Sequence, residues 1–205
     1  MTSKVTKIYI ENIINVWKKL LGRIKMNLKG SKTEKNLFKT FAGECRARTK
    51  YDLYAEKAKC DGYMWIARVF EETAKNEYAH AREVYKRYLD RINCTKNNLI
   101  EAAVGESEES NVIYKEFEKI AREEGFEDVA DFYKELQEVE EHHKERYLEL
   151  AKKLKDDRIF KSDKDTLWVC LNCGYIHEGK EAPERCPLCK YPQSYFKNID
   201  SKVCK

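Results

Sequence analysis

The sequence predicts an all-α four-helix bundle followed by a small C-terminal domain built around a metal-binding pair of cysteine knuckles. Two observations predict the bundle. Four long segments between residues 32 and 155 have the composition and apolar spacing of helices, and the second pair of segments repeats the first. A third observation predicts the small domain, because all 3 prolines and both Cys-x-x-Cys motifs follow residue 169.

Each helical segment is rich in Ala, Glu, Lys, Leu and Tyr, lacks Pro, and carries apolar residues three and four positions apart. Gly62 and Gly125 end the first and third segments, since glycine readily closes a helix. A polar stretch, residues 93–98, separates the second segment from the third. We therefore expect helices over 33–60, 63–92, 99–124 and 126–155, within a helical domain 27–158 and before a cysteine domain 165–205.

Charge and hydropathy exclude several classes of protein. The 205 residues carry a formal net charge of +4, but residues 1–26 alone carry +5, so the other 179 sum to −1. The body of the chain therefore lacks the basic surface that nucleic-acid binding requires. No apolar run is long enough to span a membrane, and no secretory signal peptide is recognisable. We expect a cytoplasmic protein with reduced thiols.

Residues 1–26 form a basic extension with an apolar stripe at helical spacing. Such a helix would lie on a membrane surface or dock a partner. A plainer interpretation is that translation begins at Met26, because residues 22–25 can be encoded by a purine-rich ribosome-binding sequence. The stripe consists of Ile10, Ile13, Ile14, Trp17, Leu21 and Ile24.

The second half of the helical region repeats the first when Gly62 is laid over Gly125, an offset of 63 residues. Two hairpins that match in this way predict a bundle with approximate two-fold symmetry. The same offset superimposes two Glu-x-x-His motifs, in which carboxylate and imidazole share one helix face. These motifs are Glu77 with His80 and Glu140 with His143.

Further glutamates lie at the height of these motifs. Glu44 lies 18 residues before the first turn glycine and Glu77 lies 15 after it, so both are ~22–27 Å from the turn. Glu106 and Glu109 lie 19 and 16 residues before the second turn glycine. Carboxylates buried together repel each other, so a cation must be present or some must be protonated. One Glu from each of two helices with Glu-x-x-His from the other two is the di-iron or di-manganese ligand pattern.

Glu109 is surplus to the repeat, which pairs Glu44 with Glu106 at an offset of 62. It could bind a metal in one oxidation state and leave it in the other, or it could simply be an exposed glutamate. Tyr51 lies seven residues beyond Glu44, and Tyr114 lies eight beyond Glu106. Each tyrosine could hydrogen-bond a liganding carboxylate, and each could equally be a core residue.

Two Cys-x-x-Cys motifs separated by twelve residues predict a tetrahedral site of four thiolates. The spacing by itself allows zinc and iron equally. A redox-active dinuclear site in the same chain favours iron, because iron can carry one electron and zinc cannot. The cysteines are Cys170, Cys173, Cys186 and Cys189, and the expected aromatic core beside them is Trp168, Tyr175, Tyr195 and Phe196.

Taken together, these motifs resemble the rubrerythrin family, which joins a ferritin-like di-iron bundle to a rubredoxin-like domain. The resemblance covers about residues 27–197 and rests on residues 27–33, 41–48, 77–80, 105–109, 120–125, 140–143 and 170–179. It implies three irons per chain, two in the bundle and one on the four cysteines. The chain departs from the pattern at Lys190, where rubredoxins usually have glycine.

The resemblance also implies a role for each ligand of the di-iron site. Glu77 and Glu140 would bridge the irons, and Glu44 would bind the first iron only. Glu106 and His143 would bind the second iron. The first iron would exchange Glu109 for His80 between its oxidised and reduced states.

The function implied is that of a non-haem di-iron peroxidase, which reduces hydrogen peroxide to water in oxidative-stress defence. Electrons would pass through the rubredoxin-type iron from NAD(P)H, by way of a rubredoxin or an NAD(P)H-dependent reductase, in a head-to-tail homodimer. Two alternatives remain open at this point. One is ferroxidase activity, and the other is a non-enzymatic iron or redox binding protein with structural zinc on the four cysteines.

Overall fold

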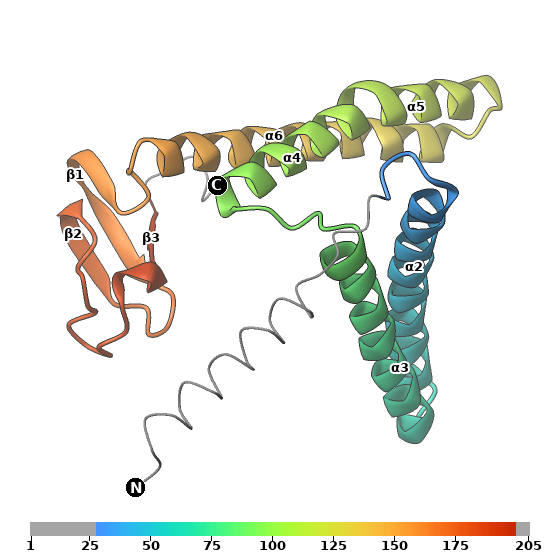
Figure 1. The fold of residues 1–205 in the computed structure, drawn as a ribbon, viewed down its shortest axis with the longest axis horizontal. Helices are drawn as coiled ribbons and strands as arrows, with labels where there is room; N and C mark the ends of the chain where they lie inside the picture. The colour runs from blue at the N-terminus through green and yellow to red at the C-terminus, as the bar shows by residue number, and fades with distance from the viewer. Residues whose placement is uncertain (1–27, 200–205) are drawn as a thin grey trace, which may run out of the picture. The chain divides into compact units, whose positions relative to one another are not determined.

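A computed structural model describes residues 28–199, which fall into two compact units, one ending at Ile92 and one beginning at Asn93. The first unit is a helical hairpin, and the second holds another helical hairpin and a small β-sheet (Figure 1). The predicted basic extension, residues 1–26, lies outside the described residues. No helix within residues 28–199 is long and apolar enough to cross a membrane.

The first hairpin pairs α2 (Lys32–Cys60) with α3 (Met64–Arg82), which continues as the π-helical turn η1 (Glu83–Tyr88). Ser31 caps α2, and its hydroxyl accepts a hydrogen bond from the Glu34 N–H at 3.0 Å. The buried residues of these two α-helices are all alanines, whose small side chains let the antiparallel backbones approach closely. They are Ala55, Ala58, Ala67, Ala74 and Ala81.

The second hairpin pairs a longer composite helix with α6 (Glu127–Lys155). The composite runs through α4 (Thr95–Glu108), the π-helical turn η2 (Glu109–Ile113) and α5 (Tyr114–Glu123). Alanines are again buried, and two of them match the first hairpin at the predicted offset of 63. These pairs are Ala58 with Ala121 and Ala67 with Ala130.

Both hairpin turns close in the same way. Gly62 and Gly125 have φ angles of +84° and +81°, a left-handed conformation that costs glycine nothing. The residue after each glycine donates its N–H back into the helix, from Tyr63 to the Ala58 carbonyl and from Phe126 to the Ala121 carbonyl, both at 2.8 Å. These bonds satisfy carbonyls that a helix end would otherwise leave unpaired.

Two helix boundaries differ from the expectation. The second helix was expected to reach residue 92 but ends at Tyr88, because Asp90 adopts a left-handed φ of +52° that no helix accommodates. The third was expected from residue 99 but begins at Thr95. The Asn98 side chain accepts from the Asn93 N–H at 2.8 Å and donates to the Asn93 carbonyl at 3.0 Å, which closes the first turn of α4.

The C-terminal domain is an antiparallel sheet in the order β2-β1-β3. Its strands are β1 (Lys161–Cys170), β2 (Ile176–Glu181) and β3 (Phe196–Asn198), and the short η3 (Gln193–Tyr195) precedes β3. Trp168 and Phe196 are buried as expected, with Tyr175 packed against them, whereas Tyr195 is exposed. The Trp168 indole donates to the Gly179 carbonyl at 2.9 Å, so the buried ring leaves no polar atom unpaired.

The left-handed turn glycines give a test of the hairpin fold. Replacing Gly125 with alanine should lower the free energy of unfolding by about 1–2 kcal/mol, because a Cβ is strained at positive φ. The surroundings offer no clash, since a Cβ built there meets nothing within 4 Å. Asparagine tolerates this conformation better, so Gly125→Asn should lose less than Gly125→Ala. Urea unfolding of the metal-free chain measures both, and equal losses would show that φ is not the cause.

Candidate metal centres

The first cluster lies within the first hairpin and joins Glu44 of α2 to Glu77 and His80 of α3. One ligand atom from each residue lies within 4.8 Å of the others. His80 Nδ1 is 2.9 Å from Glu77 Oε2 and 3.7 Å from Glu44 Oε2. The three-residue spacing places Glu77 and His80 on one face of α3, and the antiparallel pairing brings Glu44 to their level.

The second cluster has the same composition and lies within the second hairpin. Glu106 of α4 meets Glu140 and His143 of α6, again with one atom from each within 4.8 Å. His143 Nδ1 is 2.7 Å from Glu140 Oε2 and 3.9 Å from Glu106 Oε1. The structure thus brings six of the seven predicted bundle ligands into two matching groups, one in each hairpin.

The two carboxyl groups of each cluster perturb each other. In the first cluster a hydrogen bond with Glu77, together with burial, raises the pKa of Glu44, while the same bond and His80 lower the pKa of Glu77. In the second cluster burial and then the hydrogen bond with Glu140 raise the pKa of Glu106. Adjacent carboxylates resist ionising together, so they share a proton or bind a cation.

Glu109, the seventh predicted ligand, lies outside the compact group and is held by a tyrosine. The Tyr114 hydroxyl donates to Glu109 Oε2 at 3.1 Å. Burial and the Glu109 carboxylate raise the pKa of Tyr114 to about 12, so the hydroxyl stays protonated and remains a donor at neutral pH. Its counterpart Tyr51 packs its ring against Tyr54 and Phe70 and donates to no carboxylate of the described chain.

The π-helical turn η2 places Tyr114 on the ligand face of the second hairpin. Tyr114 lies eight residues after Glu106, which in an α-helix would turn it ~80° away from the ligand face. A π turn holds more residues per turn, so it absorbs one extra residue and returns Tyr114 to that face. Helix α2 has no such turn, and Tyr51 follows Glu44 by seven residues, about two α-helical turns, so both tyrosines lie on the ligand face. Their contacts differ because Ala47 stands in α2 where the offset of 62 would place a counterpart of Glu109. The change of repeat offset from 62 to 63 is the sequence signal of the insertion.

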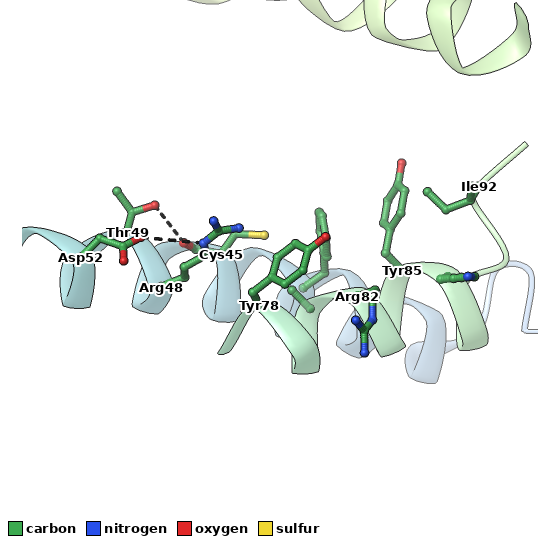
Figure 2. Close-up of a pocket in the computed structure, with 11 residues that line it drawn as sticks. Cys45, Arg48, Thr49, Asp52, Tyr78, Arg82, Tyr85 and Ile92 are labelled. Atoms are coloured by element: carbon green, nitrogen blue, oxygen red, sulfur yellow. Dashed lines mark hydrogen bonds and ion pairs between the residues drawn. The ribbon is translucent and has the colours of Figure 1, made fainter. Parts of the chain in front are cut away.

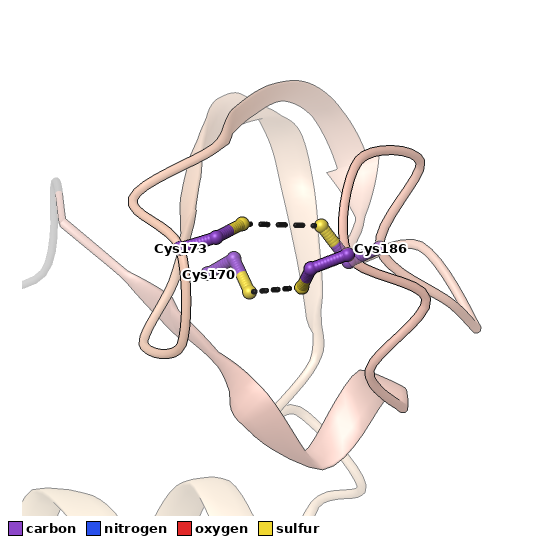
Figure 3. A group of neighbouring side chains, drawn as sticks. Cys170, Cys173 and Cys186 are labelled. Carbon is purple, nitrogen blue, oxygen red and sulfur yellow. Dashed lines mark hydrogen bonds between the residues drawn. The ribbon is translucent and has the colours of Figure 1, made fainter.

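The four cysteines converge between two matching turns (Figure 3). The Sγ atoms of Cys170 and Cys189 are 3.7 Å apart, and those of Cys173 and Cys186 are 3.6 Å apart. A tetrahedron with metal–sulfur bonds of ~2.3 Å has sulfurs ~3.8 Å apart, so the spacing fits one thiolate-bound ion, whether zinc or iron. Cys170 and Cys186 are buried, whereas Cys173 is exposed.

Backbone N–H groups near the sulfurs favour the thiolate form. The Tyr191 N–H, aided by the Asn172 side chain, lowers the pKa of Cys189 to about 6. The Tyr175 N–H acts in the same direction on Cys173. Although the residue as a whole is exposed, desolvation of its thiol among the neighbouring sulfurs outweighs this effect and raises the pKa of Cys173 to about 12. Several thiols crowded together cannot all ionise unless a cation joins them, which is the chemistry of a metal site.

Lys190 follows the last cysteine with a φ of +64°, the left-handed conformation for which glycine is suited. Its N–H donates to the Cys186 carbonyl at 2.9 Å, as the Gly174 N–H donates to the Cys170 carbonyl at 2.8 Å. The two turns are therefore alike in geometry although one ends in lysine. The departure from the rubredoxin pattern changes the residue and leaves the turn intact.

A groove of about 580 Å³ also lies on the first hairpin, away from its ligand cluster (Figure 2). Cys45 and Tyr78 line it, and each directly follows a ligand residue, so each points ~100° away from that residue around its helix. The Arg48 guanidinium lies over the Tyr78 ring, 4.7 Å from its centroid. Sequence reasoning did not find this groove, because its lining has no motif.

The tyrosine pair tests the assignment of Glu109. Tyr114→Phe should lower the free energy of unfolding of the metal-free chain by about 1 kcal/mol, the usual net value of one hydrogen bond. Tyr51→Phe removes an equivalent hydroxyl that donates to no carboxylate, so it should cost clearly less. Chemical denaturation followed by circular dichroism measures both. Equal effects would show that the Tyr114–Glu109 bond does not stabilise the fold.

Comparison with known proteins identifies the family. A family model described as Rubrerythrin matches residues 35–151 and, in a second match, 97–168. A model described as Rubrerythrin, rubredoxin-like domain, matches residues 168–197. Rubrerythrin-1 of Clostridium acetobutylicum is 42% identical over 186 residues, covering 83% of this chain and 95% of that protein. Rubrerythrin of Nitratidesulfovibrio vulgaris is 41% identical over 183 residues, with the same coverage.

Among solved structures, one titled Partially Reduced State of Nigerythrin is 33% identical and covers 81% of this chain and 86% of its own, with a TM-score of 0.33. The assignment therefore rests on the sequence matches, which agree with the two Glu–Glu–His clusters and the four-cysteine site. They confirm the predicted fold class, a ferritin-like four-helix domain with a rubredoxin-like domain, and the predicted iron cofactors. The chain belongs to the rubrerythrin family of oxidoreductases.

Proposed function

We propose that this chain is a peroxidase that reduces hydrogen peroxide to water at a di-iron site and draws its electrons through the iron of the four-cysteine site. One observation carries the proposal. Two matched Glu–Glu–His clusters occur in the same chain as a four-thiolate site. A di-iron site that reduces an oxidant would therefore have, in the same protein, an iron centre that can pass it electrons one at a time. A protein that only stores or oxidises iron has no need of such a centre.

The two clusters would hold one iron each, and the family resemblance implies that Glu77 and Glu140 would be ligands of both irons. Glu109 would bind the first iron in its oxidised state, in place of His80. Oxidation adds positive charge to a metal ion, which favours an anionic carboxylate over the neutral imidazole of His80. The Tyr114 bond supports this role, because it holds Glu109 close to Glu106 and Glu140 but outside their compact group.

The reaction consumes one hydrogen peroxide, two protons and two electrons and yields two water molecules. A pair of ferrous ions held by the two clusters would supply these two electrons, one from each ion. The chain's own part would be to hold both ions with carboxylates and imidazoles. The protons come from solvent, which reaches the His80 and His143 side chains.

The four-cysteine site is suited to receive electrons from a donor protein. Cys173 is an exposed residue, so one side of the site lies at the surface of the domain. We infer that a rubredoxin or an NAD(P)H-dependent reductase in the cytoplasm docks there, and that the site holds iron. Zinc would fit the same sulfur geometry, and the protein would then be a binding protein with no electron inlet.

An anaerobic stopped-flow experiment tests the peroxidase. The reduced protein mixed with hydrogen peroxide should show rapid oxidation of the di-iron site, followed by bleaching and recovery of the iron–thiolate absorption as a donor turns over. Glu77→Ala should abolish the rapid phase, because it removes a ligand that both irons share. His142→Ala is the control, since His142 is exposed and belongs to neither cluster.

Two results would overturn the proposal. One is a four-cysteine site without visible absorption. The other is peroxide consumption by the wild type that is no faster than by Glu77→Ala. The redox-silent binding protein would then be the better interpretation. Rapid oxidation by molecular oxygen with ferrous iron as substrate, and slow oxidation by peroxide, would instead indicate a ferroxidase.

We further infer a head-to-tail homodimer in which the cysteine site of one chain serves the di-iron site of its partner. Helix α6 continues for twelve residues after His143, which carries the backbone ~18 Å along the helix axis before the cysteine domain begins. Within one chain, electrons from the cysteine site would have to travel back over that distance to reach the ligand clusters. A second copy can present its cysteine domain directly.

Complementation between two inactive chains tests this arrangement. One chain carries Cys170→Ser and Cys173→Ser, the other carries Glu77→Ala and Glu140→Ala, and the two are co-expressed with different tags. Random pairing makes half of the dimers mixed, and each mixed dimer contains one intact electron path, so roughly a quarter of wild-type donor-coupled turnover should return. Turnover that stays at the level of the separate variants would contradict transfer between subunits.

A further inference from the structure

We propose that each helical hairpin by itself supplies enough ligands to bind one divalent metal ion, so that the two ions of the chain load independently even where Glu77 and Glu140 bridge them. The inference concerns metal loading and does not depend on the peroxidase proposal. It follows from where the ligands lie. All three atoms of the first cluster come from α2 and α3, and all three of the second come from α4 and α6.

Each cluster is already drawn together by contacts inside its own hairpin. Three ligand atoms within 4.8 Å leave room for one ion between them, with no rearrangement of the backbone. In the first cluster His80 contacts both carboxylates, at 2.9 Å and 3.7 Å. In the second cluster His143 does the same, at 2.7 Å and 3.9 Å.

Cross-helix contacts fix the register of the first hairpin on both sides of its cluster. Lys59 of α2 pairs with Glu71 of α3 on the side of the hairpin turn. At the opposite end of the helix pair, Glu34 of α2 lies 3.8 Å from the Arg91 guanidinium, just beyond η1. Glu44 is therefore held level with Glu77 by the hairpin itself.

The second hairpin is fixed in the same way. Ser110 and Asn111 of η2 each donate to the Glu141 carboxylate of α6 at 3.4 Å, one residue away from the ligand Glu140. Nearer the hairpin turn, Gln137 donates to Glu118 of α5 at 2.8 Å. Neither half-site needs the other hairpin in order to bring its ligands together.

Charge and ligand type also fit one ion for each hairpin. Two carboxylates and a neutral imidazole carry a formal charge of −2, which one divalent cation neutralises. Oxygen and nitrogen donors with open coordination positions suit ferrous iron, manganese and cobalt, and water can fill the remaining positions. An obligatory pair site would instead leave each hairpin with too few ligands to hold an ion without its neighbour.

Cobalt(II) binding to the full chain tests independence. One equivalent of zinc first fills the four-cysteine site, which prefers zinc to cobalt. Equilibrium dialysis against cobalt and metal analysis then count the ions bound in the bundle. Wild type should bind two cobalt ions per chain, and a chain without either half-site should bind none.

Two double variants remove one half-site each, Glu44→Ala with His80→Ala and Glu106→Ala with His143→Ala. Each should bind one cobalt ion, with an affinity reduced by no more than about 150-fold, the range of ordinary coupling between sites. The matched control is Glu108→Ala with His142→Ala, which removes an exposed glutamate and an exposed histidine from the second hairpin. It should still bind two ions.

Either of two results would overturn the proposal. If one double variant is folded by circular dichroism, retains its zinc and binds no cobalt, the ions load only as a pair. If it binds two ions, the removed residues are not ligands. Should an alanine variant fail to fold, glutamine at both positions gives side chains of similar size that lack the carboxylate charge of Glu and the ring nitrogens of His, and the same counts apply.

Discussion

The contact between two carboxylates inside each hairpin is the constraint on which the rest of the architecture depends. Glu44 meets Glu77, and Glu106 meets Glu140, closely enough for one pKa of each pair to rise. Such a contact is unfavourable unless a proton or a cation lies between the groups. The alanines buried between the helices make it possible, since larger side chains would hold the backbones too far apart. Close packing and metal chemistry are therefore linked in this fold.

The two hairpins bring their carboxylates together with slightly different helices. In the first hairpin α2 is uninterrupted and the π turn η1 only follows the end of α3, whereas in the second the π turn η2 lies between α4 and α5 and begins with an additional carboxylate, Glu109. A π turn is less favourable than an α-helical turn and persists where it has a structural or functional use. Here it returns Tyr114 to the ligand face and lets its hydroxyl hold Glu109. One inserted residue thus turns a symmetric repeat into an asymmetric pair of clusters.

The two kinds of metal centre are separated by ligand chemistry as well as by position. Carboxylate and imidazole groups on helices serve the bundle, and thiolates on tight turns serve the small sheet domain. The buried residues of that domain are few, and two of them are the cysteines Cys170 and Cys186. A core so small gains much of its stability from the bound ion. A four-cysteine site of this type can therefore keep its ligand geometry in a very small domain.

The sequence alone determined the helical class, the repeat, the two Glu-x-x-His motifs and the four-cysteine site, because these depend on residue type and on spacing within one element. It also indicated which glutamates share a level and that Glu109 is surplus to the repeat, although it left open whether Glu109 contacts the site. Only the tertiary structure decided the helix ends at Tyr88 and Thr95, the π turn, and the different contacts of Tyr51 and Tyr114. The physical reason is helix phase. One additional residue rotates everything after it by ~100°, and whether the backbone absorbs that rotation depends on what packs against it.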